Sequence, residues 1–327
     1  MRILLSRTDR VGDLVLSTPA IASLRRSFPD ASIALVCSEY NRVVVERNLD
    51  LSRIETLPNG VDPSRFGARF RGQADVAIAL APRAADIRLI GATRATRRIG
   101  YTYVSRLLAR LTARRYLTDL LLSEADPRLA ERHDPYPVRH EVLQLLALVD
   151  RAGANKLVYD LSLPVNDEDR AQVAHVPRDG ITVHIAQRWM HDGSTLESLI
   201  VLLRELRALG RPLVITHGED ASAAAGAIAA AGVADCIAGS LPFLAWAATF
   251  ERSACVVTVD TGATHVASAM RRPTVVVFEH RYFRLNSQEW APWGVPYALV
   301  RKPAGEDPAS LAVLRGEIVE SVKRLVK

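Results

Sequence analysis

An aspartate lies within the segment Arg7–Thr18 (RTDRVGDLVLST), which directly follows a first predicted strand. We expect this segment to be a loop at the strand's carboxyl end, where Gly12 allows a tight turn of the backbone and Asp13 projects towards a ligand. A carboxylate in that position can act as a general base that takes a proton from an attacking hydroxyl. The alternative is that Asp13 caps or braces the loop, while Asp9 and Arg10 form a local ion pair.

A second loop, Val259–His265 (VDTGATH), lies between a buried strand and a helix rich in small residues. The free N–H groups and the positive dipole end of such a helix form an anion site. Gly262 allows a ligand close to the backbone, and Thr261 and His265, four residues apart, can face the same ligand. Asp260 would repel a diphosphate, so we assign it to orienting the loop or to a sugar hydroxyl. Alternatively, Asp260 and Thr261 only cap the helix and His265 packs against the sheet.

The elements around these loops alternate between short apolar runs and amphipathic segments, which is typical of a parallel sheet in an α/β protein. The predicted strands are 3–6, 32–36, 76–80, 181–185, 213–216, 256–259 and 274–278, and the predicted helices are 19–28, 139–152, 195–209, 222–231, 264–270 and 308–326. Pro164, Asn166 and Asp167 break the pattern and predict a boundary between two domains, 1–165 and 166–327. Such sheets bind ligands at the carboxyl ends of their strands, so we expect a cleft between the domains.

The composition agrees with a globular protein of two domains: 327 residues, 49% hydrophobic and 24% charged. No apolar run reaches the ~18 residues of a membrane span, and three cysteines without metal-ligand spacing indicate reduced thiols and a cytoplasmic location. The net charge of +6 is carried mostly by arginine, which suits an anionic ligand, whereas the low aromatic content argues against nucleic acid. No dinucleotide fingerprint follows a strand, which counts against an NAD enzyme. We also expect no D-x-D metal bridge to a donor diphosphate in the chain, which favours metal-independent chemistry.

Together and in this order, the two loops resemble the family 9 glycosyltransferases, the ADP-heptose:lipopolysaccharide heptosyltransferases. The resemblance comprises R-x-D-R-V-G-D-L-V-L-S-T-P-A at 7–20, R-W with an amphipathic helix at 188–209, V-D-T-G-A-T-H-V-A-S-A at 259–269, R-P-T-V-V-V-F at 272–278 and P-W-G at 292–294. It implies a GT-B fold: two Rossmann-like domains face each other across a cleft, and the final helix returns to the first domain. The first domain is then expected to hold the acceptor and the base, and the second the nucleotide sugar.

The resemblance also implies roles for single residues. Asp13 becomes the catalytic base of an inverting, metal-independent transfer from a nucleotide diphosphate sugar, ADP-heptose above others, to a lipopolysaccharide-core-like glycan or glycolipid. The expected donor-binding residues are Arg188, Glu219, Asp260, Thr261, Gly262 and His265, and those on the acceptor side are Arg10, Gly12 and Arg83. The chain departs from the family at Gln187, where a lysine usually precedes the tryptophan; Arg188 is expected to supply that charge.

Nine arginines lie between Arg83 and Arg115. Within this segment the spacing of Val104, Leu107, Leu108 and Leu111 against the arginines predicts a basic amphipathic helix, suited to the inner-membrane surface or a phosphorylated acceptor. A solvated helix flank is the alternative.

Two other functions fit the same architecture. One is a nucleotide-sugar epimerase, and the other is a non-catalytic, two-lobed protein that binds sugar nucleotides.

Overall fold

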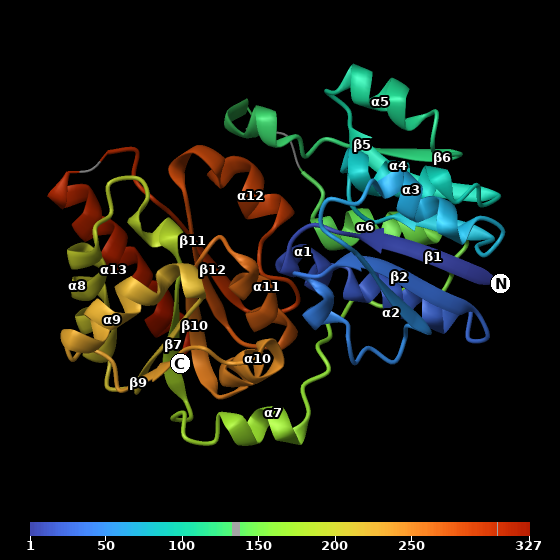
Figure 1. The fold of residues 1–327 in the computed structure, drawn as a ribbon. Helices are drawn as coiled ribbons and strands as arrows, with labels where there is room; N and C mark the ends of the chain where they lie inside the picture. The colour runs from blue at the N-terminus through green and yellow to red at the C-terminus, as the bar shows by residue number, and fades with distance from the viewer. Residues whose placement is uncertain (133–137, 306) are drawn as a thin grey trace. The chain divides into compact units, whose positions relative to one another are not determined.

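The computed structural model describes residues 1–132, 138–305 and 307–327. The chain divides into two compact units. The first begins at Met1 and ends at Ser162, and the second runs over Leu163–Lys327 and also takes in residues 130–132. This division lies close to the boundary expected at residue 165. In each unit, a parallel sheet is covered by helices (Figure 1).

The sheet of the first unit has the strand order β3-β2-β1-β4-β5-β6, with every neighbouring pair parallel. Its strands are β1 (Arg2–Arg7), β2 (Ser32–Ser38), β3 (Arg53–Leu57), β4 (Val76–Ala79), β5 (Arg97–Tyr103) and β6 (Asp119–Ser123). The chain moves outward in one direction from β1 and in the other from β4. The strand order therefore reverses between these two strands, the position where open α/β sheets bind ligands.

The helices of this unit lie on both sheet faces and bury apolar side chains against the strands. They are α1 (Val11–Leu16), α2 (Thr18–Ser27), α3 (Pro63–Gly67), α4 (Ala84–Ala92), α5 (Leu107–Ala113) and α6 (Glu141–Arg151), with short 3-10 turns η1 (Arg42–Val44), η2 (Ala68–Phe70) and η3 (Pro127–Arg132). α2 packs against α6, while α3 and α4 pack against each other and share a core cluster with β1 and β4.

The second unit repeats the plan with the strand order β12-β11-β10-β7-β8-β9, again all parallel. Its strands are β7 (Gly180–Ile185), β8 (Leu213–His217), β9 (Cys236–Ala238), β10 (Ser253–Val259), β11 (Thr274–Phe278) and β12 (Tyr297–Arg301). Here the order reverses between β7 and β10. The loops after residues 185 and 259 are far apart in the sequence, but they are neighbours at the carboxyl ends of these two central strands.

Helices also cover this second sheet. They are α7 (Asp167–Gln172), α8 (Leu196–Arg207), α9 (Ser222–Ala230), α10 (Phe243–Glu251), α11 (Gly262–Ala269), α12 (Phe283–Glu289) and α13 (Pro308–Leu325), with turns η4 (Gln187–Met190), η5 (Glu219–Ala221) and η6 (His280–Tyr282). Leu314, Ile318 and Val322 of α13 are buried in the core cluster of this unit, beside α8 and the strands β10 to β12. The expected return of the last helix to the first domain is therefore corrected, because its apolar stripe packs on its own sheet.

The segment Arg7–Thr18 is not a long loop, as the sequence suggested. Only Thr8–Arg10 separate β1 from α1, and α2 follows after a single residue. Leu14, Val15 and Leu16 are fully buried. Since buried backbone groups need hydrogen-bond partners, a helix is the conformation that lets these residues enter the core. Asp13 thus belongs to the first turn of a helix.

Candidate functional site

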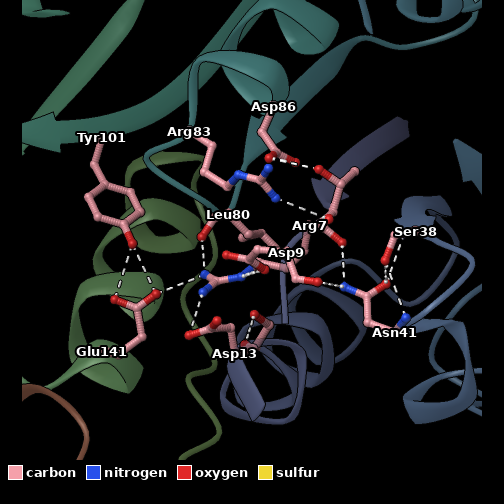
Figure 2. Close-up of polar contacts among 12 residues, drawn as sticks. Arg7, Asp9, Asp13, Ser38, Asn41, Leu80, Arg83, Asp86, Tyr101 and Glu141 are labelled. Carbon is pink, nitrogen blue, oxygen red and sulfur yellow. Dashed lines mark hydrogen bonds and ion pairs between the residues drawn. The ribbon is translucent and has the colours of Figure 1, made fainter. Parts of the chain in front are cut away.

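The carboxyl edge of the first sheet is organised around one buried arginine, Arg7, at the end of β1 (Figure 2). Its side chain is 2% exposed, and each nitrogen has its own contact. Nε donates to Asp9 at 2.8 Å, Nη2 lies 3.2 Å from Oδ1 of Asp13, and Nη1 donates to Glu141 at 2.8 Å. Nη1 also donates to the main-chain oxygen of Leu80, which follows β4. The guanidinium thus joins the two strands between which the sheet order reverses.

Glu141 reaches this site from α6, more than 130 residues along the chain from Arg7. It is buried, and the Tyr101 hydroxyl donates to its two carboxylate oxygens at 2.9 and 3.1 Å (Figure 2). A carboxylate held by a tyrosine and an arginine has little freedom to turn, because charge-assisted bonds are short and directional. Glu141 therefore fixes one side of the Arg7 guanidinium, and the opposite side faces Asp9 and Asp13.

Charge is unbalanced in this network, since one arginine faces three carboxylates. Burial alone would lower the pKa of Arg7, but Asp9, Asp13 and Glu141 together raise it well above its ordinary value. Burial raises the pKa of Asp9, against the attraction of Arg7. Burial and the neighbouring Asp9 raise the pKa of Asp86 to about 6, although Thr8 donates to it at 3.0 Å. Arg7 is consequently a permanent cation, and its Nη2 lies against the Asp13 carboxylate.

Asp13 itself is 17% exposed and lies in the first turn of α1, so it combines contact with Arg7 and access to solvent. The alternative of an Asp9–Arg10 pair is wrong: Asp9 pairs with Arg7, and Arg10 is exposed at the N-cap position of α1. Gly12 is buried within the helix, so it does not form a tight turn. Arg83, an exposed residue after β4, donates to the main-chain oxygen of Thr8 at 3.2 Å and thereby supports the short connection before α1.

In the second unit, Arg188 and Asp260 meet where the strand order reverses, the first after β7 and the second after β10. Nη1 of Arg188 donates to the main-chain oxygen of Asp260 at 2.6 Å and to its carboxylate at 2.9 Å. Asn286 of α12 donates to the same carboxylate oxygen at 2.7 Å. Burial raises the pKa of Asp260, while Arg188 and Asn286 oppose that rise. Asp260 thus holds the Arg188 guanidinium beside the loop after β10.

The helix that begins at Gly262 has no side-chain cap. Thr261 occupies the N-cap position, but its hydroxyl contacts Val259 and Thr258, each at 3.3 Å, and makes no cap hydrogen bond. The amide group of Thr264 donates to the main-chain oxygen of Thr261 at 3.1 Å. The amide groups that precede it have no acceptor one turn back within the helix, which makes a helix start suitable for an anion. Thr261 and Gly262 are partly exposed, whereas His265 is 5% exposed in the following turn. The Thr261 side chain therefore does not cap α11, which corrects that part of the alternative reading, and the His265 side chain is buried.

A buried lysine, which the sequence did not reveal as functional, supports the Arg188 turn. Lys302 follows β12 and is 1% exposed. Its ammonium group donates to the main-chain oxygens of Arg188, Trp189 and His191 at 2.6, 3.1 and 2.7 Å. Burial lowers the pKa of Lys302 to about 8, against the attraction of acidic neighbours. Three bonds from one cation hold the turn that presents Arg188 to Asp260.

The remaining donor candidates lie on the next loop. Glu219 is exposed in η5, after β8, and its main-chain oxygen accepts from Ser222 at 2.8 Å. Gln187, which stands where the family has lysine, is exposed and its amide lies 3.4 Å from the main-chain oxygen of Asp220. The loops after β7 and β8 are therefore neighbours. Within the described chain, however, Arg188 pairs with Asp260 and not with Glu219.

The described residues offer no site for a metal ion. Over residues 1–132, 138–305 and 307–327, no three His, Cys, Asp or Glu side chains form a group able to hold one. A D-x-D sequence does occur at Asp167 and Asp169, outside both loops. There Asp169 forms a capping box with Asn166 at the start of α7, which is a structural role. Nor does any helix in the described part of the chain have the length and apolarity required to cross a membrane.

Comparison with known proteins now identifies the family. Residues 202–310, which contain the Asp260 loop, match the sequence model of glycosyltransferase family 9 (heptosyltransferase). Residues 202–310 thus carry the sequence pattern of the family 9 glycosyltransferases. The resemblance drawn from the two loops is thereby confirmed, as is the class of enzyme. No curated protein matches the chain significantly.

Solved structures extend the likeness to the whole chain. A family 9 glycosyl transferase from Veillonella parvula has a TM-score of 0.78 at 15% identity, over 99% of this chain and 97% of its own. The E. coli ADP-heptose lps heptosyltransferase II has a TM-score of 0.75 at 18% identity, over 100% of this chain and 98% of its own. E. coli heptosyltransferase WaaC with ADP has a TM-score of 0.70 at 15% identity, over 100% of this chain and 99% of its own. At these identities the likeness concerns the fold, and it confirms the predicted α/β GT-B class with two Rossmann-like domains.

Proposed function

We propose that this glycosyltransferase transfers a heptose from ADP-heptose, with inversion and without a metal ion, to a hydroxyl of a lipopolysaccharide-core-like acceptor. The observation that carries the proposal is the pairing of Arg188 with Asp260 beside the uncapped start of α11, at the strand reversal of the second unit. The family match and the ADP held by E. coli heptosyltransferase WaaC support ADP as the nucleotide.

The donor diphosphate would bind at the start of α11. Amide groups of the first turn and the positive dipole end would face its oxygens, and Arg188 would contribute a forked cation. Asp260 holds Arg188 in place, and the backbone at Gly262 allows the diphosphate to approach. Because these donors are fixed before the reaction, they stabilise the negative charge that grows on the departing diphosphate without reorganising. His265, one turn into the helix, is assigned to the same end of the donor.

Asp13 would be the general base. Its carboxylate takes the proton of the acceptor hydroxyl while the hydroxyl oxygen attacks the anomeric carbon, on the face opposite the bond to the diphosphate. The new glycosidic bond then has inverted configuration, and the nucleoside diphosphate leaves. A positioned base contributes roughly 10²–10⁴-fold to the rate. Arg7 lies 3.2 Å from the Asp13 carboxylate and would hold it in place. Because an aspartate is a weak base, proton transfer would come late in the attack.

Arg10, Gly12 and Arg83 would belong to the acceptor side. Arg10 and Arg83 are exposed near the Asp13 turn, and their guanidinium groups suit phosphates or carboxylates of an anionic glycan or glycolipid. A cytoplasmic location, close to the inner membrane, is part of the same proposal. Glu219 is assigned to the donor side on its position after β8 alone.

A transfer assay with purified protein tests this function. With ADP-heptose and a lipopolysaccharide-core acceptor, we expect a product of inverted configuration that forms equally well in the presence of EDTA. Failure with every nucleotide sugar and acceptor would overturn the proposal. New sugar isomers formed without acceptor would indicate an epimerase instead, and binding without turnover would indicate a non-catalytic protein. On the donor side, His265→Ala should weaken ADP binding in calorimetry; an unchanged affinity would remove His265 from the site.

A further inference from the structure

The first unit carries an apolar stripe that its own core does not cover. On α5 the side chains of Leu107, Leu108 and Leu111 are 61%, 81% and 50% exposed, and Val104, just before the helix, is 41% exposed. The spacing of Leu107, Leu108 and Leu111 places them along one side of the helix. Scattered exposed leucines are ordinary, but three neighbouring leucines on one helix face, with Val104 in the turn before the helix, form a patch that indicates an interaction site.

The stripe is held in this orientation by the opposite side of α5. Ala113 is buried, and Arg106 at the N-cap position donates to Asp126 at 3.0 Å and lies 4.4 Å above the Tyr103 ring. The helix packs on β5 and α4. The leucines are therefore outside because the polar and small side of the helix is already anchored to the sheet.

The chain segment that carries the stripe has charged residues of one sign only. Residues 87–118 contain eight arginines and no aspartate or glutamate. Of these arginines, Arg114 and Arg115 are exposed at the end of α5, and Arg110 is partly exposed within it. Exposed leucines bordered by arginines are the combination that lies in the interface of an anionic bilayer, with the apolar groups below the headgroups and the cations beside the phosphates.

We propose that the α5 face, defined as Val104, Leu107, Leu108 and Leu111 with Arg110, Arg114 and Arg115, docks on an anionic phospholipid bilayer. A second copy of the chain is a poorer occupant, because a symmetric contact through this face would bring arginines against arginines. The helix has seven residues, too few to span the bilayer, so it lies at the surface. In the proposed function, this contact would bring the enzyme to a lipid-linked acceptor; lipid binding itself does not depend on that function.

Co-sedimentation of the full chain with vesicles tests the docking. Vesicles of phosphatidylcholine with about 30% phosphatidylglycerol should bind the protein, with an affinity that falls as salt rises, and pure phosphatidylcholine should bind it weakly. Arg114→Gln should cost about fivefold in partitioning, the fold-change that corresponds to about 1 kcal/mol per arginine near an anionic surface. The triple change of Leu107, Leu108 and Leu111 to serine should cost at least about tenfold.

Matched controls come from the same unit. Leu49 is 97% exposed and Arg65 is exposed, and both lie outside the α5 face, so Leu49→Ser and Arg65→Gln should leave binding unchanged. Since the altered side chains are exposed, melting temperatures should not change. Absence of binding by the wild type, equal binding by the triple variant, or a dimer in lipid-free solution that the triple variant abolishes would each overturn the proposal. Transfer to a soluble acceptor analogue should be the same in all variants, which separates a failure of docking from a failure of the proposed function.

Discussion

Replacement of Asp86 by asparagine should stabilise the protein at neutral pH, although it alters a buried residue beside the candidate site. Asp86 has 0% exposure, and its Oδ1 has no hydrogen-bond partner in the described part of the structure. Burial raises its pKa from 3.8 to about 6. Because the folded state then binds more protons than the unfolded state between these two values, the stability contribution falls as the pH rises through this window.

The magnitude follows from that pKa. A shift from 3.8 to about 6 corresponds to about 3 kcal/mol at neutral pH, at about 1.36 kcal/mol per pH unit, as an upper value. The introduced asparagine would remain an acceptor for Thr8 but would leave a buried amide N–H without a partner, which costs about 1–3 kcal/mol. We therefore expect Asp86→Asn to raise the free energy of unfolding by about 0–2 kcal/mol at pH 8. At pH 4 the variant should be less stable than the wild type.

Urea unfolding of wild type and variant across pH 4 to 8 measures this difference. The decisive quantity is its pH dependence, a relative gain for the variant of about 3 kcal/mol between pH 4 and pH 8. Asp30→Asn is the matched control, because it makes the same chemical change at an exposed position. A difference for Asp86→Asn that stays constant across this range would refute the argument that burial holds the pKa of Asp86 high.

Two further changes probe the residues that hold the site. Tyr101→Phe removes both hydroxyl bonds to Glu141, so we expect a loss of about 1–2 kcal/mol in stability and a lower kcat with KM unchanged, measured in the transfer assay. An unchanged kcat would show that Glu141 does not position the base through Arg7. Lys302→Met leaves three main-chain oxygens without their donor, so residues 187–191 should exchange amide hydrogens faster and ADP should bind about tenfold more weakly. Lys323→Met, on exposed α13 surface, is its control, and equal exchange in both variants would contradict the role of Lys302.

The sequence predicted most of the central strands because these are continuous apolar runs buried on both faces. It missed β3, β5, β6, β9 and β12, which lie at or next to the edges of the two sheets, where charged residues or incomplete burial interrupt the apolar pattern. The segment after β1 was predicted as a loop because the glycine and the aspartate resembled turn chemistry. The burial of the three residues after Asp13, which requires a helix, depends on tertiary packing that local sequence does not contain.

The candidate site shows the same division. Asp13, Asp260 and Thr261 could be proposed from short motifs, since each lies within a few residues of the end of a strand. Glu141 and Lys302 could not, because each reaches its partner from more than 100 residues away and carries no motif. For Lys302 one signal was present: it is one of only four lysines in a chain that otherwise uses arginine. A compact ammonium group fits a pocket of three carbonyl oxygens, where a planar guanidinium would not.

The most direct test of the account is the turnover of Asp13→Asn. Asparagine keeps the size of the side chain and removes its ability to accept the acceptor proton, while Arg7 retains Asp9 and Glu141 as partners. We predict that kcat of sugar transfer falls by about 10²–10⁴-fold, with ADP affinity and melting temperature close to those of the wild type. A folded variant that transfers sugar at the full wild-type rate would contradict the assignment of Asp13 as the base.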